Sequence, residues 1–402
     1  GLVGNLAIVL GKKCLVASGQ AVDPEIDPAI GRAAKFFGFY VQKGNIPYGE
    51  HEPWYGHSGN GKESLAAVLF AMMGDKPVET EYWTRLVTAG YNGREYGHTG
   101  QGFSYLWGAM AANVGGTNAA AAYLKELRWH LDLERRSDGS FVYDDQETIG
   151  GSATYDYWNS ASYYDMDPTA TYVLTYALAK QQLLLTGRNA NPTNWLSSDK
   201  VTNAIWAGMF DQLVAGYGTN QLMSALSEYD PHVRYWAATQ LGHTATAAPL
   251  VPALTNLVGS STNPWVREAA CVALGVMAKT PALPVLAQAL RDTDTWVRLQ
   301  AAQAIRSYSS AVASAQLTNM LTALITNATN PNVIVWTDPL QHANGYLSQA
   351  LFGNAVPDGS PGNNVAADTI NANTNLLYPA VRAGLKQPDS YPRVGAASFA
   401  YN

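Results

Sequence analysis

The sequence predicts an all-α protein in which an α/α toroid is followed by an α-solenoid. Similar helix starts recur 33 and 31 residues apart in the second half of the chain. A glycine-rich loop with a following apolar helix is duplicated 41 residues apart in the first half. Internal repeats of this length are supersecondary units that stack to bury a shared core. We expect a toroid domain at residues 1–215, a repeat domain at 216–353 and a C-terminal extension at 354–402 that continues the solenoid.

The toroid prediction starts from the duplicated loop. Its two copies are Tyr55-Gly-His-Ser-Gly-Asn-Gly61 and Tyr96-Gly-His-Thr-Gly-Gln-Gly102, and they lead into apolar helices at 64–73 and 103–113. Further helices are expected at 29–40, 78–89, 119–133 and 169–185. Helix hairpins of about 40 residues joined by glycine-rich loops favour an incomplete or full barrel whose inner helices are all entered from one rim.

The solenoid prediction depends on three helix starts: Asp230-Pro-His-Val-Arg234, Asn263-Pro-Trp-Val-Arg267 and Asp294-Thr-Trp-Val-Arg298. Each begins with Asp or Asn, which are good N-caps, and proline is tolerated at the position that follows. Counted from each valine, alanine stands four residues later and Leu or Ile eight residues later. One face of each helix is therefore small and apolar.

Helices expected at 249–257 and 283–290 alternate with these three, so that each unit is a helix pair. The motif resembles the opening of the second helix of HEAT repeats, over roughly residues 220–353. A degenerate fourth unit is expected at Asn330-Pro-Asn-Val333. The resemblance implies a HEAT-like α-solenoid with a surface that is suited to a protein partner.

The chain as a whole also resembles a known family. The resemblance depends on Ile46-Pro-Tyr-Gly-Glu50, Arg94-Glu-Tyr-Gly-His-Thr-Gly100, Lys125-Glu-Leu-Arg-Trp129 and Leu377-Tyr-Pro-Ala-Val-Arg382. These motifs are similar to those of an uncharacterised bacterial family of secreted proteins that joins an α/α toroid to HEAT-like repeats. The resemblance implies an extracellular or periplasmic location and no particular activity. Members are usually longer at both ends, and we expect this sequence to be part of a longer protein.

Composition excludes several functions. The net charge is −6 and no run of basic residues exceeds Lys12-Lys13, so we expect no nucleic-acid partner. The longest strongly apolar stretch, Leu65–Met73, is about half of the ~20 residues that a membrane span needs. Cys14 and Cys271 form neither a disulfide framework nor a thiol metal cluster. The spacing of the histidines matches no metal site, and we expect no metal and no cofactor.

The toroid rim is the predicted catalytic site, because both duplicated loops should enter the barrel there. The candidate catalytic residues are Tyr55, His57, Arg94, Tyr96 and His98. A tyrosine, a histidine and an arginine around an acidic sugar are the groups that β-elimination requires: a cation for the carboxylate, and a base and an acid for the scissile bond. The alternative is structural, with histidines that hold neighbouring loops by hydrogen bonds to the backbone.

The candidate substrate-binding residues come from an unusually aromatic part of the chain. They are Trp54, Tyr157, Trp158, Tyr163 and Asp165. Aromatic faces with polar tips suit amphipathic ligands such as sugars. Carboxylates in the expected loops also allow glycoside hydrolysis, which needs two such groups across a sugar. Asp138, which precedes Gly139, is interpreted instead as a turn residue.

Two further motifs are interpreted without catalysis. Gly56–Lys62 resembles a phosphate-binding loop, but Glu63 stands where Ser or Thr is needed and no buried strand precedes the loop, so we expect no nucleotide. Lys62 should instead pair with a carboxylate or line the rim. Asp165-Met-Asp167-Pro168 resembles the acid motif of toroidal terpene cyclases, but Pro168 replaces its last aspartate. A helix cap followed by proline explains that pair.

Taken together, the sequence predicts a secreted carbohydrate-active protein, a polysaccharide lyase or a glycoside hydrolase, that acts on a glycan at the toroid rim. The alternative is a non-catalytic binding or assembly protein that uses the toroid and the HEAT-like surface. Two carboxylates, or a Tyr, His and Arg set within hydrogen-bond reach of a pocket, would favour the enzyme.

Overall fold

The computed structural model describes residues 1–47, 53, 55–57, 61–92, 100–141, 169–244, 248–308, 316–328, 374–386 and 393 of the 402-residue chain. These residues form α-helices and short 3-10 helices, with one isolated antiparallel bridge between Arg135 and Phe141 and no strand. The predicted all-α class is confirmed. Within the same described ranges, no helix is long and apolar enough to cross a membrane.

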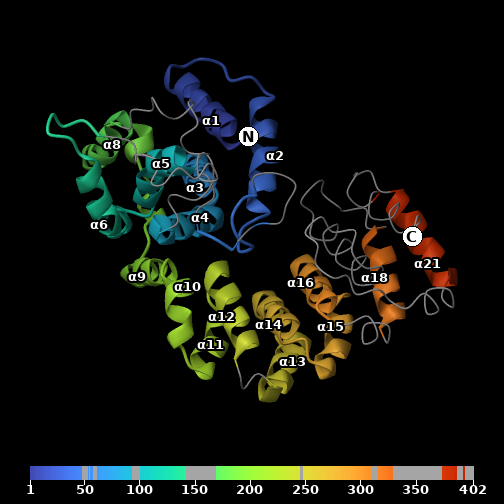
Figure 1. Ribbon diagram of the computed structural model, residues 1–402. Coiled ribbons are helices and arrows are strands. Elements are labelled where there is room, and N and C mark those ends of the chain that lie inside the picture. The colour runs from blue at the N-terminus through green and yellow to red at the C-terminus, as the bar shows by residue number, and fades with distance from the viewer. Residues whose placement is uncertain are drawn as a thin grey trace, which may run out of the picture. The chain divides into compact units, whose positions relative to one another are not determined.

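The chain divides into two compact units. The N-terminal unit is built from Gly1–Tyr48 and Pro53–Phe210, and the main part of the C-terminal unit runs from Asp211 to Asn402. The described α-helices of the N-terminal unit are α1 (Leu2–Ala17), α2 (Ile26–Gly38), α3 (Lys62–Met73), α4 (Pro77–Ala89), α5 (Gly100–Val114), α6 (Thr117–Glu134), α8 (Thr169–Tyr176) and α9 (Ser198–Ala207). Helix α3 packs against α1, α4 and α5, and α5 also packs against α6 and α8 (Figure 1).

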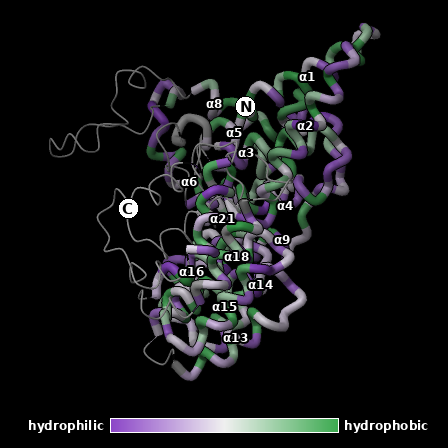
Figure 2. The backbone as a smooth tube through the Cα atoms, turned by 90° about the vertical axis from the view of Figure 1, so that its right-hand side faces the viewer, coloured by the Kyte–Doolittle hydropathy of each residue, from purple (hydrophilic) through white to green (hydrophobic). Residues whose placement is uncertain are grey.

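Helices α3 and α4 form the centre of this unit. Every residue from Glu63 to Phe70 in α3 is buried, and so is every residue from Tyr82 to Ala89 in α4. A helix that is buried on all sides needs little amphipathicity, and the strongly hydrophobic sequence of α3 fits that position (Figure 2). Two threonines of α4 satisfy their hydroxyl groups locally: Thr80 donates to the carbonyl of Lys76 at 2.7 Å and Thr88 to that of Thr84 at 2.8 Å.

The predicted helices at 64–73, 78–89, 103–113 and 119–133 are confirmed, and the real ones begin up to three residues earlier. The prediction of one helix over 169–185 is wrong in its second half. Helix α8 ends at Tyr176, and two short 3-10 helices follow, η2 (Leu178–Lys180) and η3 (Leu184–Thr186). The chain bends between them because Gln181 has a φ of 48° in the left-handed region.

The turn between α5 and α6 contains two glycines that allow close packing on Thr84 and Trp195. A Cβ on Gly115 would lie 2.8 Å from Cγ2 of Thr84, and one on Gly116 would lie 2.8 Å from the ring of Trp195. Gly116 also has a φ of 92°, which favours glycine. Antiparallel hairpins of this kind are compatible with the predicted toroid, whose closure stays a prediction.

The C-terminal unit consists of helix pairs. Its α-helices beyond α10 (Phe210–Leu213) are α11 (Thr219–Ala225), α12 (Pro231–His243), α13 (Val251–Ser260), α14 (Pro264–Met277), α15 (Leu283–Ala289), α16 (Thr295–Arg306), α18 (Leu317–Ala328) and α21 (Thr374–Leu385). Helices α12, α14 and α16 stand side by side in one row (Figure 1). Helices α11, α13 and α15 each pack on a member of that row, which is the two-layer arrangement of a solenoid.

The three predicted N-caps are confirmed. The side chains of Asp230, Asn263 and Asp294 accept hydrogen bonds from backbone N–H groups two residues later, at 2.9, 2.9 and 2.8 Å. The valines of the repeats are buried as predicted, with exposed fractions of 0% for Val233, 9% for Val266 and 0% for Val297. The small and large apolar positions that follow them are fully buried: Ala237, Ala270, Ala301, Leu241, Leu274 and Ile305.

Two glycines set how closely neighbouring helices of the row approach. A Cβ on Gly242 in α12 would lie 2.4 Å from Cβ of Val276 in α14, and one on Gly275 in α14 would lie 2.8 Å from Cα of Ala304 in α16. Both glycines stand nine residues after the repeat valine. The first two repeats therefore share this glycine, whereas Arg306 stands at the same position in the third, and our sequence prediction did not include it. The degenerate fourth unit at 330–333 lies outside the described residues.

Candidate functional site

Of the residues predicted at the toroid rim, the structure describes two. Tyr55 is half-buried and His57 is buried. A Cβ on Gly90, at the end of α4, would lie 3.2 Å from the carbonyl oxygen of His57, so the backbone of His57 packs tightly on that helix end. The remaining predicted residues lie outside the described ranges: Trp54, Arg94, Tyr96, His98, Tyr157, Trp158, Tyr163 and Asp165. The shared rim site stays a prediction.

The residues after the first glycine-rich loop begin a structural helix. Gly61 precedes α3 with a φ of 65°, and the buried carboxylate of Glu63 accepts a hydrogen bond from the backbone N–H of Ile46 at 3.1 Å. Burial lowers the pKa of Lys62, and the negative charge of Glu63 partly opposes that effect. Glu63 therefore holds the chain segment before the loop, a role that the phosphate-loop comparison had not suggested.

The interpretation of Asp138 as a turn residue is confirmed. Its Oδ1 accepts hydrogen bonds from the backbone N–H and the hydroxyl of Ser140, at 2.9 and 2.7 Å. Gly139 between them has a φ of 87°. The hydrogen bonds from the Ser140 hydroxyl and backbone are the main reasons why the pKa of Asp138 is lowered.

A buried polar cluster in the N-terminal unit was not found from the sequence. Glu134, the last residue of α6, accepts a hydrogen bond from the hydroxyl of Tyr172 in α8. Its other oxygen lies 3.0 Å from Nε2 of His130, one turn earlier in α6. The three residues are at most 5% exposed. We call them the Glu134 cluster. The sequence signal was a histidine in the predicted helix at 119–133 and a glutamate four residues later, directly after that helix.

The Glu134 cluster lies where the chain leaves for residues 142–168 and returns. The backbone N–H of Phe141 donates to the hydroxyl of Thr169 at 2.9 Å, and the ring of Phe141 lies 4.7 Å from that of Tyr172. A carboxylate, an imidazole and a phenol are the groups that general acid–base chemistry uses. The cluster also joins the ends of α6 and α8, because its hydrogen bond links side chains that are 38 residues apart.

In the C-terminal unit, an arginine from each repeat links it to the next. Arg234, Arg267 and Arg298 each donate to a backbone carbonyl six residues or fewer before them. Arg234 then lies 5.1 Å from the ring of Trp265, Arg267 binds the carboxylate of Asp292, and Arg298 donates to Oδ1 of Asn327 at 3.2 Å. The partner changes from one repeat to the next, but the bridge is kept.

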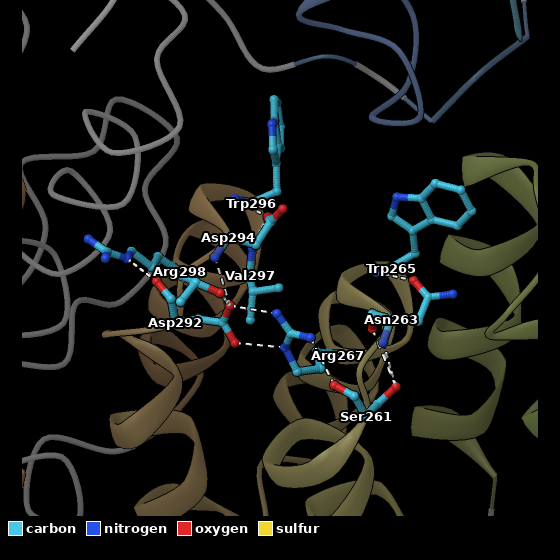
Figure 3. Close-up of polar contacts among 10 residues, drawn as sticks. Ser261, Asn263, Trp265, Arg267, Asp292, Asp294, Trp296, Val297 and Arg298 are labelled. Atoms are coloured by element: carbon cyan, nitrogen blue, oxygen red, sulfur yellow. Dashed lines mark hydrogen bonds and ion pairs between the residues drawn. The ribbon is translucent and has the colours of Figure 1, made fainter. Parts of the chain in front are cut away.

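The middle bridge has the strongest geometry. Nη2 and Nε of Arg267 lie 2.7 and 2.8 Å from the two oxygens of Asp292 (Figure 3). Two parallel charge-assisted hydrogen bonds of this kind fix orientation as well as distance. Burial by itself would raise the pKa of Asp292, but hydrogen bonds from Arg267 and from the backbone N–H of Asp294 outweigh burial, and the pKa is lowered. Trp265 and Trp296 project away from this ion pair (Figure 3).

A groove of about 590 Å³ opens beside that bridge. The C-terminal end of α13, the exposed side of α15 and the start of α18 form its walls, and it includes Val258, Ser260, Val285, Gln288, Arg291 and Asn319. We call it the α13–α15 groove. No sequence motif predicted it, although Pro284 and Gln288 share one side of the predicted helix at 283–290 and Arg291 directly follows that helix. Within the described ranges, no group of three or more His, Cys, Asp or Glu side chains is placed to hold a metal ion.

Comparisons with known proteins agree with this architecture. Residues 1–187 match the family model of a domain of unknown function (DUF6288), and residues 219–306 and 251–331 match that of HEAT repeats. No curated protein matches the chain. The crystal structure of an engineered protein is similar to 99% of this chain over 98% of its own, with 12% identity and a TM-score of 0.35. The expected combination of an uncharacterised domain with HEAT-like repeats is confirmed.

Proposed function

Because the chain joins a DUF6288 domain to HEAT repeats, we propose that it is a non-catalytic binding or assembly protein whose solenoid holds a partner protein. The α13–α15 groove is the observation that supports this proposal. Its apolar residues lie next to polar and charged side chains, as in the core and rim of protein interfaces.

The construction of the solenoid adds to this support. The arginine bridges and the closely packed glycines hold successive repeats in fixed positions. A binding surface that is already ordered loses less conformational entropy when a partner binds, so more of the contact energy contributes to affinity.

Site-specific photo-crosslinking tests this function. A photoreactive phenylalanine analogue would replace Gln288, which is exposed in the groove, in cells that naturally contain the protein. The matched control replaces Leu133 in the N-terminal unit, which is 77% exposed. We expect an adduct of discrete mass from the position in the groove only. Absence of that adduct, or equal adducts from both positions, would contradict partner binding by the solenoid.

A second candidate function is carbohydrate chemistry in the N-terminal unit, and the Glu134 cluster is the observation that favours it. In this view the cluster and the predicted rim residues act on a glycan outside the cell or in the periplasm. The test is a panel of acidic and neutral polysaccharides, with unsaturated ends read for a lyase and reducing ends for a hydrolase. We expect Glu134→Gln and Tyr172→Phe to abolish the product while the circular dichroism spectrum is retained. No product from any member of the panel would reject this candidate.

A further inference from the structure

We propose that the α13–α15 groove binds an extended peptide segment of the partner and that Arg291 pairs with an acidic side chain of that segment. The inference rests on the proposed function, because it names the chemistry of the partner that the solenoid holds. Three observations support it: an arginine without a carboxylate, donors and acceptors on opposite walls, and apolar side chains between them.

Arg291 is the cation that the groove leaves unpaired. Its guanidinium donates one hydrogen bond, to Oδ1 of Asn319 at 3.3 Å, and no carboxylate in the described part of the chain lies within ion-pair distance. The neighbouring Asp292 is already engaged by Arg267 and by the backbone N–H of Asp294. Since the charges of Arg267 and Asp292 cancel, the groove keeps the positive charge of Arg291.

A carboxylate is the group that fits such an arginine. A guanidinium has five N–H donors in a planar fork that matches the two oxygens of a carboxylate. Arg267 demonstrates this pairing beside the same groove, where it binds Asp292 through two hydrogen bonds. Arg291 is exposed and has most of its donors available, so an acidic side chain from outside can form the same fork.

The walls of the groove suit an extended backbone. On α15, the side-chain amide of Gln288 is exposed and makes no hydrogen bond with the described residues. On the other wall, α13 ends at Ser260, so the carbonyls of Val258, Gly259 and Ser260 have no intrahelical partner. Donors on one side and backbone acceptors on the other can serve the C=O and N–H groups of an extended peptide, whereas a helical segment would have used its own groups internally.

The apolar residues of the groove determine which side chains we expect next to the acidic side chain of the bound peptide. Val285 and Pro284 of α15 line the groove together with the buried Val258 of α13. Because burying apolar surface away from water favours binding in proportion to the area, an aliphatic side chain beside the acidic one would gain most here. The expected segment therefore contains Asp or Glu next to Val, Ile or Leu.

Selection from a displayed library of random heptapeptides against the intact chain tests this inference, followed by fluorescence anisotropy with the selected peptide. We expect an acidic residue beside an aliphatic one in the enriched sequences. Replacing that residue by its amide should weaken binding about tenfold, and Arg291→Glu should weaken it by more. Gln288→Ala should have a smaller effect, about threefold.

Lys279→Glu is the matched control, because it makes the same change of charge at an exposed position of the same unit outside the groove. It should leave the dissociation constant unchanged. Binding that survives Arg291→Glu would overturn the groove assignment but not partner binding by the solenoid. A library without an acidic consensus, or without any enriched peptide, would also overturn the inference. The photo-crosslinking experiment decides the proposed function separately.

Discussion

Both units hold their helices together with polar side chains, but the bridges differ in kind. In the C-terminal unit, arginines repeat along the solenoid, with Arg234 buried and Arg267 and Arg298 partly buried, and each reaches the next repeat. In the N-terminal unit, the Glu134 cluster is buried, and among the described residues no repeat generates a counterpart of it. If one arginine bridge is lost, the bridges between the other repeats remain. Loss of the Glu134 cluster removes the hydrogen bond that joins α6 to α8. Loss of one member should therefore cost more in the N-terminal unit.

We expect the largest effect from a substitution that disrupts the shared core of the solenoid. Val297→Asp places an unpaired charge at a fully buried position, and we expect the C-terminal unit to lose about 4 kcal/mol or more and to unfold. Val266→Asp, at a position that is 9% exposed, should be severe but milder. Thermal melting followed by circular dichroism measures both. A native-like melting curve for Val297→Asp would contradict the assignment of the repeat valines to one core.

Removing the carboxylate of the Glu134 cluster should have the next largest effect. Glu134→Ala leaves the hydroxyl of Tyr172 and the imidazole of His130 buried without that partner, at a cost of about 3–5 kcal/mol. Glu134→Gln keeps an acceptor for Tyr172 and should cost less. Urea denaturation measures both free energies. Equal losses for the two variants would show that the negative charge of the carboxylate matters, and not the acceptor for Tyr172 or the volume of the side chain.

A substitution at Gly275 tests how closely α14 packs on α16. Gly275→Ala would bring a methyl group to 2.8 Å from the backbone of Ala304, and we expect a loss of about 1–3 kcal/mol. The control is Gly259→Ala in α13, where the nearest atom to the new Cβ is 3.9 Å away. That variant should be neutral or slightly stabilising, because alanine has a higher helix propensity than glycine. Similar effects at both positions would argue against close packing of α14 on α16.

We expect the smallest effect from a substitution in the repeated arginine bridges of the solenoid. Arg267→Ala should cost about 1–2 kcal/mol at neutral pH, less than Glu134→Ala. The pKa of Asp292 is lowered below its ordinary value of 3.8, so its contribution is present above that value and is lost as pH falls through the lower, folded-state pKa. We expect the wild-type chain to lose this contribution below about pH 4 and the variant to lose less. Denaturation curves at several pH values check the difference, and parallel pH profiles would contradict it.

The sequence predicts more of the C-terminal unit than of the N-terminal unit. The N-caps Asp230, Asn263 and Asp294 and the buried repeat valines could be predicted, because a cap acts within three residues and a repeat shows its apolar positions several times. The bend at Gln181 could not, because nothing in the local pattern of 169–185 distinguishes a helix from two 3-10 turns. The rim residues Tyr55 and His57 were identified from a duplication, and their shared site remains to be tested.

By itself, the sequence determined the all-α class, the helix pairs and the positions that face the core of the solenoid, since these depend on local propensity and on periodicity along the chain. The tertiary structure alone decided which residues work together. Arg267 meets Asp292 across 25 residues, and Tyr172 meets Glu134 across 38. The α13–α15 groove likewise exists only where three helices come together. Contacts between distant residues depend on how helices pack in three dimensions, and a pattern along a single chain does not contain that information.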